Sequence, residues 1–257
     1  MRMTMPLGRY VDTDSPVHRL DPRAKLIAML LYAAVVLMIS SLRGLLLTAL
    51  ASAAVMALTR VPFKVYLRSL KPLRWLIVFI FLFPILFQQG WPDGIIQGTV
   101  TAGRMVLFIV FTAILTFTTR QSQLIQALEW LLKPFRRFGV SPEKWSLMMN
   151  LALRFIPTIV EEAKLILKAQ ASRGVDFAER SWREKASALI TLLVPVTANT
   201  FRRAQELTDS MEARGFVPGM PRTHFHELVW NGRDTVFLLG CVLFMALMFM
   251  LRFWTGW

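Results

Sequence analysis

Apolar residues follow two different patterns along this chain of 257 residues. In the first pattern they are almost uninterrupted, in five runs at residues 26–42, 45–59, 75–87, 96–119 and 235–253. A helix of about 20 apolar residues crosses a hydrocarbon core of about 30 Å, and flanking interfacial residues compensate for shorter runs. The first pattern therefore predicts about five transmembrane helices.

In the second pattern, from residue 120 to 228, apolar residues recur every three or four positions, as on one face of a helix. Two long amphipathic helices are predicted over 141–174 and 181–215, after a shorter one at 123–138. At about 1.5 Å per residue, each long helix measures roughly 45 to 50 Å. The chain is thus expected to have three parts: an N-terminal tail with four spans (1–119), a domain of amphipathic helices (120–228), and a last span with a short C-terminus (229–257).

Both long helices carry start signals and an internal proline. Ser141-Pro142-Glu143 supplies a capping hydroxyl, a proline in the first turn and an acid near the helix N-terminus, and Ser181 to Glu184 is a capping box. Proline removes a backbone donor and clashes with the preceding turn. Pro157 and Pro195 are therefore predicted to act as hinges.

The two long helices also end alike, in Arg173-Gly174 and Arg214-Gly215. Glycine readily takes the left-handed backbone that ends a helix, and arginine suits the negative end of the helix dipole. A single ending of this kind is most simply an ordinary helix C-terminus. Two copies, each preceded by small residues, favour a pair of tips that enter grooves and bind carboxylates of another protein.

Smaller features concern the spans. Asp21 and Pro22 can cap and open the first helix, while Arg23 and Lys25 can extend to the lipid headgroups. Arg104, inside the fourth run, is expected to extend to the outer surface. Close packing between spans is predicted along two stripes of small residues: Ala49, Ala53 and Ala57, and Gly94, Gly98 and Ala102.

Composition and charge agree with a membrane protein. Hydrophobic residues make up 55% of the chain, and the mean hydropathy is +0.49. The net charge of +14 would suggest nucleic acid in a soluble protein, but 27 of the 30 basic residues lie in 1–25, in a predicted loop at 60–74, and in 120–234. The positive-inside rule then places the N-terminus and the amphipathic domain in the cytoplasm and the C-terminus outside. The predicted fold is an all-α integral membrane protein with a cytoplasmic domain of long helices.

Sequence motifs for catalysis are absent. There is no phosphate-binding loop, HExxH, GxSxG or CxxC motif, and the single Cys241 allows no intrachain disulfide. His224, His226 and Glu227 form a poor set of metal ligands and are better explained as a solvated loop. Two alternatives to a noncatalytic subunit are a self-contained permease and a membrane-embedded enzyme. The former requires polar or broken-helix sites at mid-membrane, and the latter requires clustered catalytic side chains.

Four segments together resemble one family. They are His18 to Leu26 (HRLDPRAKL), Leu128 to Pro134 (LEWLLKP), Ala152 to Thr158 (ALRFIPT) and the two Arg-Gly helix ends. The chain resembles the transmembrane T component of energy-coupling factor (ECF) transporters, the vitamin and metal importers of prokaryotes. The likeness extends over nearly the whole length.

The resemblance implies a set of partners in a prokaryotic plasma membrane. Two ABC-type ATPases, A and A′ or a homodimer, would bind ATP and Mg, while this chain would bind no cofactor and no nucleic acid. Their motion would reorient a substrate-binding membrane protein, the S component, which chooses the vitamin or metal and is expected to be one of several that share the chain.

The resemblance also implies which residues couple to the ATPases. They are Ala171, Ser172, Arg173, Gly174, Ala213, Arg214 and Gly215. Ser172 stands where the family commonly has alanine, a residue of similar size.

Overall fold

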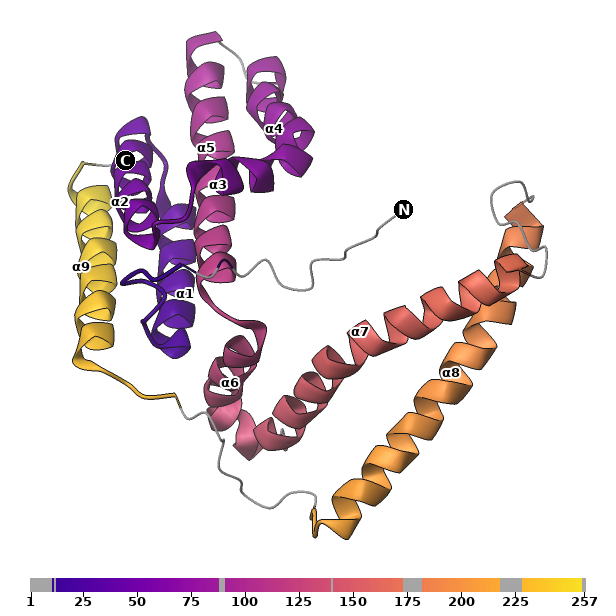
Figure 1. The fold of residues 1–257 in the computed structure, drawn as a ribbon. Coiled ribbons are helices and arrows are strands. Elements are labelled where there is room, and N and C mark those ends of the chain that lie inside the picture. Colours follow the sequence, from indigo (N-terminus) through magenta and orange to yellow (C-terminus); the bar gives the residue numbers. More distant parts are fainter. Residues whose placement is uncertain are drawn as a thin grey trace. The chain divides into compact units, whose positions relative to one another are not determined.

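The computed structural model describes residues 11, 13–87, 91–139, 141–172, 182–217 and 228–255, and all regular structure in these ranges is helical (Figure 1). The helices are α1 (Pro22–Met38), α2 (Leu42–Thr59), α3 (Phe63–Leu70), the 3₁₀ helix η1 (Lys71–Leu73), α4 (Arg74–Phe87), α5 (Trp91–Thr118), α6 (Gln121–Leu132), the 3₁₀ helix η2 (Lys133–Phe138), α7 (Pro142–Ser172), α8 (Trp182–Ala213) and α9 (Gly232–Thr255). The all-α prediction is confirmed.

Four helical segments among the described residues are long and apolar enough to cross a membrane: Leu42–Thr59, Phe63–Phe87, Trp91–Thr118 and Gly232–Trp254. The remaining predicted span, at residues 26–42, corresponds to α1, which has 17 residues. The expectation of about five spans is therefore consistent with the structure.

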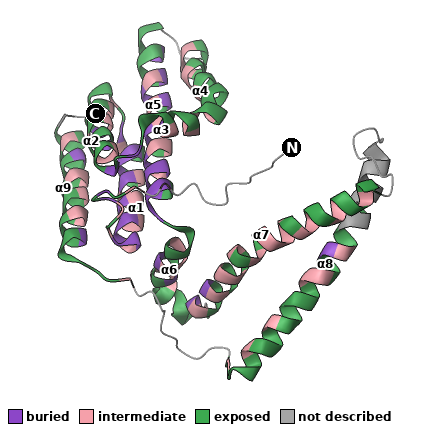
Figure 2. Cartoon of the chain, in the orientation of Figure 1, coloured by how far each residue is buried: buried purple, intermediate pink, exposed green. Residues whose placement is uncertain are grey.

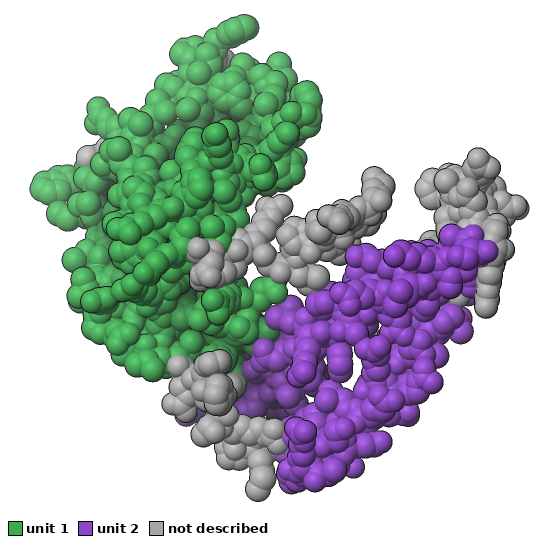
Figure 3. Space-filling view, viewed as in Figure 1, with its two compact units in different colours: residues 1–131, 225–257 green, residues 132–224 purple. Residues whose placement is uncertain are grey.

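The chain forms two compact units (Figure 3). Unit 1 comprises Met1–Leu131 and Phe225–Trp257, and unit 2 comprises Leu132–His224. Unit 1 holds the apolar helices, and unit 2 holds the two long amphipathic ones.

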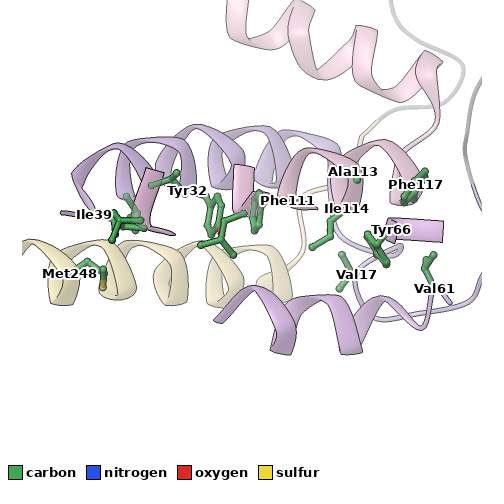
Figure 4. Close-up of a cluster of buried hydrophobic side chains, with 14 residues drawn as sticks. Val17, Tyr32, Ile39, Val61, Tyr66, Phe111, Ala113, Ile114, Phe117 and Met248 are labelled. Atoms are coloured by element: carbon green, nitrogen blue, oxygen red, sulfur yellow. The ribbon is translucent and has the colours of Figure 1, made fainter. Parts of the chain in front are cut away.

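The core of unit 1 lies between α1, α2, α5 and α9 (Figure 4). The rings of Tyr32 and Phe111 stack with centroids 3.9 Å apart, and the Tyr32 hydroxyl hydrogen-bonds to Ser52 of α2. Thr48 and Ser52 are buried and donate to backbone carbonyls one turn earlier in α2. Because a membrane interior offers no water, these internal hydrogen bonds satisfy the polar groups of the packed face.

The buried face of α2 is not the one that the alanine pattern predicted. Of the three predicted alanines, Ala49 is partly buried against the core, but Ala53 and Ala57 are exposed. The fully buried residues of this face are Gly44, Thr48, Ser52 and Thr59. The second small stripe is confirmed: Gly94, Gly98 and Ala102 are all buried, and a Cβ atom on Gly98 would collide with the carbonyl oxygen of Phe81. Only glycine permits this close approach of α5 to α4.

A polar cluster joins one end of α1, α5 and α9. As predicted, Asp21 caps α1, accepting a hydrogen bond from the Arg23 amide at 2.8 Å. The Asp21 amide donates to Asp234 of α9 at 2.7 Å, and the Lys25 ammonium donates to the Thr118 carbonyl at 2.9 Å. The prediction that Lys25 extends to the headgroups is therefore wrong. Its side chain is 5% exposed because unpaired carbonyls at the end of α5 provide a nearer partner than the lipid surface.

The predicted basic loop at 60–74 is also wrong, because most of it is helical. Arg60 takes a left-handed backbone (φ 53°) that ends α2, and Pro62 precedes the first residue of α3. Tyr66 anchors α3, since it is 1% exposed and its hydroxyl hydrogen-bonds to Thr59 at 2.8 Å.

Candidate functional site

The N-terminus of α7 forms as its sequence predicts. Pro142 is the first helical residue and is buried, and the Trp145 amide donates to the Ser141 carbonyl at 3.2 Å. Glu143, in the first turn, lies 3.6 Å from the Arg136 guanidinium of η2. These contacts fix where the helix begins.

The helices α7 and α8 pack against each other in opposite directions (Figure 1). Glu162 of α7 is the polar link: its carboxylate accepts a hydrogen bond from the Asn199 amide group and lies 3.9 Å from the Arg203 guanidinium, both on α8. The Glu162 side chain is 14% exposed, so this ion pair is partly shielded from water. The link therefore holds the two helices together near their middles.

Pro157 and Pro195 lie inside α7 and α8, and both helices continue through them. Each proline leaves one carbonyl of the preceding turn without its helical donor. Their role as hinges stays a prediction.

The C-terminus of α8 has the backbone geometry that its Arg-Gly sequence predicts. Gly215 has φ +71°, its amide donates to the Glu212 carbonyl at 2.8 Å, and the Phe216 amide donates to the Met211 carbonyl at 2.9 Å. This pair of bonds is a Schellman motif, which ends a helix at a left-handed glycine. Arg214 is therefore the last residue before the left-handed glycine, and it is exposed.

At the C-terminus of α7, Ala171 and Ser172 are exposed, and the Ser172 hydroxyl donates to the Lys168 carbonyl at 3.1 Å. Arg173 and Gly174 lie outside the described residues, as do His224, His226 and Glu227. Within the described ranges, no group of three or more His, Cys, Asp or Glu side chains is placed to hold a metal ion.

The two arginines stand at equal sequence distances from the members of the Glu162–Arg203 ion pair. Arg173 follows Glu162 by eleven residues, and Arg214 follows Arg203 by eleven residues. The helices α7 and α8 end at Ser172 and Ala213, ten residues beyond Glu162 and Arg203, so at 1.5 Å per residue each extends about 15 Å beyond the link. Because the helices run in opposite directions, their C-terminal tips point away from each other.

The apolar stripe of both helices is largely uncovered (Figure 2). Only Pro142 and Ser146 of α7 are buried. The exposed large apolar side chains are Trp145, Met148, Met149, Ile156 and Leu165 on α7, and Ile190, Leu193, Val194 and Phe201 on α8. An apolar surface of this extent is typical of a binding face for another protein or for lipid.

The site therefore combines two chemistries on one helix pair. Guanidinium groups bind carboxylates through two parallel hydrogen bonds, and a small neighbour such as Ala213 leaves room for a close approach. The apolar stripe behind the tips offers non-directional contact to an apolar partner. Sequence reasoning predicted the tips and the stripe, but it missed Glu162, Asn199 and Arg203, because an acid and a base 41 positions apart show no pairing in one sequence.

Known proteins are similar to this chain over most of its length. The family model described as "CbiQ: Cobalt transport protein" matches residues 13–225. The energy-coupling factor transporter transmembrane protein EcfT of Bacillus subtilis (strain 168) is 39% identical and covers 98% of this chain and 100% of its own length. The protein of the same name from Heliobacterium modesticaldum is 38% identical (94% and 98%), and that from Listeria innocua is 37% identical (98% and 100%).

Proposed function

The chain belongs to the CbiQ family of transporter transmembrane proteins, and from this premise we propose that it is the noncatalytic transducer subunit of an energy-coupling factor importer. It couples ATP hydrolysis by two cytoplasmic ATPases to the reorientation of a small membrane protein that binds the vitamin or metal. ATP and Mg belong to the ATPases.

The observation that carries the proposal is the arrangement of the two helix ends. The C-termini Ser172 of α7 and Ala213 of α8 lie at opposite ends of one helix pair that shares the Glu162–Arg203 ion pair, and in the sequence an arginine directly follows each end. One tip then meets each ATPase, and relative motion of the two ATPases changes the angle at which the two helices cross. Ala171, Ser172, Gly174, Ala213 and Gly215 shape the tips, and Arg173 and Arg214 bind acidic residues in the ATPase grooves.

The exposed apolar stripe supports the second half of the proposal. A helix pair that buried its own stripe would have no surface left for a membrane partner. Phe201 of α8 is 71% exposed and Leu165 of α7 is 66% exposed, which suits a surface that the S component covers in the complex. Packed helices transmit displacement as rigid bodies, so movement at the tips reaches this surface.

The orientation follows from charge. The domain with the tips and the N-terminus are expected to face the cytoplasm, where ATP is available, and the C-terminus is expected to face outward, because 27 of the 30 basic residues fall in segments that the positive-inside rule assigns to the cytoplasmic side.

Co-purification of the tagged chain from its native membrane tests the proposal. Two ATPase polypeptides and a small hydrophobic protein should accompany it. The variant Arg173→Glu/Arg214→Glu should lose the ATPases, because reversed charges repel the groove carboxylates, while insertion into the membrane is unchanged. A matched control, Lys133→Glu/Arg137→Glu, changes the net charge equally at exposed positions away from the tips and should keep the ATPases. Recovery of a lone chain that transports solute would instead favour a self-contained permease.

A further inference from the structure

The helix α3 presents two opposite faces with different chemistry. One face packs against the rest of unit 1 through Tyr66, whose ring lies edge-on to Phe117 of α5 with centroids 5.5 Å apart. Lys64, Arg68 and Lys71 follow one another at spacings of four and three, so they form a stripe on the opposite face. All three are exposed on the surface of unit 1.

The cations of this stripe lack a local counter-charge. No Asp or Glu occurs between residues 60 and 92, and none of the ion pairs among the described residues involves Lys64, Arg68, Lys71 or Arg74. Like charges spaced by one helical turn repel one another. Such a stripe gains free energy when an anion binds beside it.

The stripe borders a hollow of about 530 Å³ in the elbow where η1 turns the chain from α3 into α4. Lys64, Arg68, Lys71 and Arg74 line one part of it, and Ile77 and Val78 of α4 line another. Its walls are almost entirely apolar apart from these charged groups. The hollow therefore combines a cationic rim with an apolar wall.

The apolar wall leads along a membrane-facing helix. None of the residues of α4 is buried, and Trp75, at its start, is 73% exposed and lies beneath the Arg74 guanidinium at 5.4 Å from the ring centroid. Tryptophan and arginine at the start of an apolar helix are typical of the interface between headgroups and acyl chains. The rim thus lies at headgroup level, and the wall lies at acyl-chain level.

We propose that the elbow between α3 and α4 binds an anionic phospholipid. Its phosphate is held by Lys64, Arg68, Lys71 and Arg74, and an acyl chain lies against Ile77 and Val78. The amphiphilic lining selects this ligand: a free phosphate leaves the apolar wall uncovered, and an acidic protein surface has no hydrocarbon to place there. The site rests on unit 1 alone and is independent of the proposed coupling to ATPases.

The test uses the full chain, with any subunits that copurify, and counts bound lipid by native mass spectrometry during titration with phosphatidylglycerol or phosphatidylcholine. The variant Lys64→Gln/Arg68→Gln/Lys71→Gln should bind phosphatidylglycerol roughly a hundredfold more weakly, at about a factor of five per cation, with phosphatidylcholine binding unchanged. The matched control Lys133→Gln/Arg137→Gln/Lys168→Gln removes the same charge from exposed positions of unit 2 and should bind both lipids as the parent does.

A second variant, Ile77→Asn/Val78→Asn, tests the apolar wall. It should weaken phosphatidylglycerol binding although all four cations are still present.

Unchanged phosphatidylglycerol affinity in the cation variant would overturn the proposal. So would displacement of the lipid by inorganic phosphate at equal concentration, which would show a phosphate site, or occupation of the stripe by an acidic protein in place of lipid. Circular dichroism on each variant establishes that the helices are retained.

Discussion

Replacing Asp234 by alanine should destabilise unit 1 strongly. The Asp234 carboxylate is 1% exposed and accepts two backbone hydrogen bonds at 2.7 Å, from the Asp21 amide at the start of α1 and from the Asn231 amide at the start of α9. The Lys25 ammonium also lies within electrostatic range. One side chain thus joins two helix N-termini and balances a buried cation.

The magnitude follows from the number of bonds lost. A hydrogen bond to a charged group contributes about 1.5 to 3 kcal/mol, so losing two costs roughly 3 to 6 kcal/mol. For a chain of this size, that lowers the melting temperature by roughly 6 to 24 °C. Asp234→Asn keeps an oxygen acceptor for one amide and should lose about half as much.

Thermal unfolding of the purified chain in detergent, followed by circular dichroism, measures this effect. Asp93→Ala is the matched control, because Asp93 is exposed in the first turn of α5 and contributes about 1 kcal/mol or less through the helix dipole. If Asp234→Ala and Asp93→Ala melted at the same temperature, the reasoning from buried hydrogen bonds would be refuted.

Three further substitutions test separate features. Gly98→Val should separate α4 from α5 and lower the melting temperature, whereas Gly240→Ala, whose Cβ meets nothing within 4 Å, should not; equal melting would contradict the close approach. Gly215→Ala should cost about 1 kcal/mol at the left-handed position and speed amide exchange at the end of α8, so unchanged exchange would count against the cap. Pro157→Ala should reduce substrate uptake by the reconstituted complex more than membrane abundance, and loss of the protein alone would instead assign Pro157 to folding.

The long helices could be predicted from sequence because their signals are local. The predicted range 141–174 encloses α7, and 181–215 encloses α8, since capping residues, internal periodicity and a terminal glycine all lie within the helices themselves. The close approach of α5 to α4 at Gly98 could also be predicted, because glycines and alanines at four-residue spacing are a local pattern typical of closely packed helices.

The errors come from contacts made with distant parts of the chain. Lys25 extends inward because the Thr118 carbonyl, 93 residues away, completes its hydrogen bonds. The face of α2 that packs against α1 carries Ser52, which hydrogen-bonds to the Tyr32 hydroxyl, and the sequence of α2 alone does not show this partner. The helix α3 was missed because it is only eight residues long and lies in a basic segment between two prolines, and its anchor, the packing of Tyr66 against Thr59 and Phe117, cannot be read from the sequence.

The most direct test of the central claim measures whether the two tips move with the ATPase cycle. Spin labels are placed at Ser172→Cys and Ala213→Cys, with Cys241 replaced by serine, in the complex with its ATPases and substrate-binding protein. Pulsed electron paramagnetic resonance then gives the distance distribution between the labels, without nucleotide and with ATP trapped. The account predicts that the distribution shifts when ATP binds and returns after hydrolysis. An identical distribution in both states, in a complex that still transports, would contradict it.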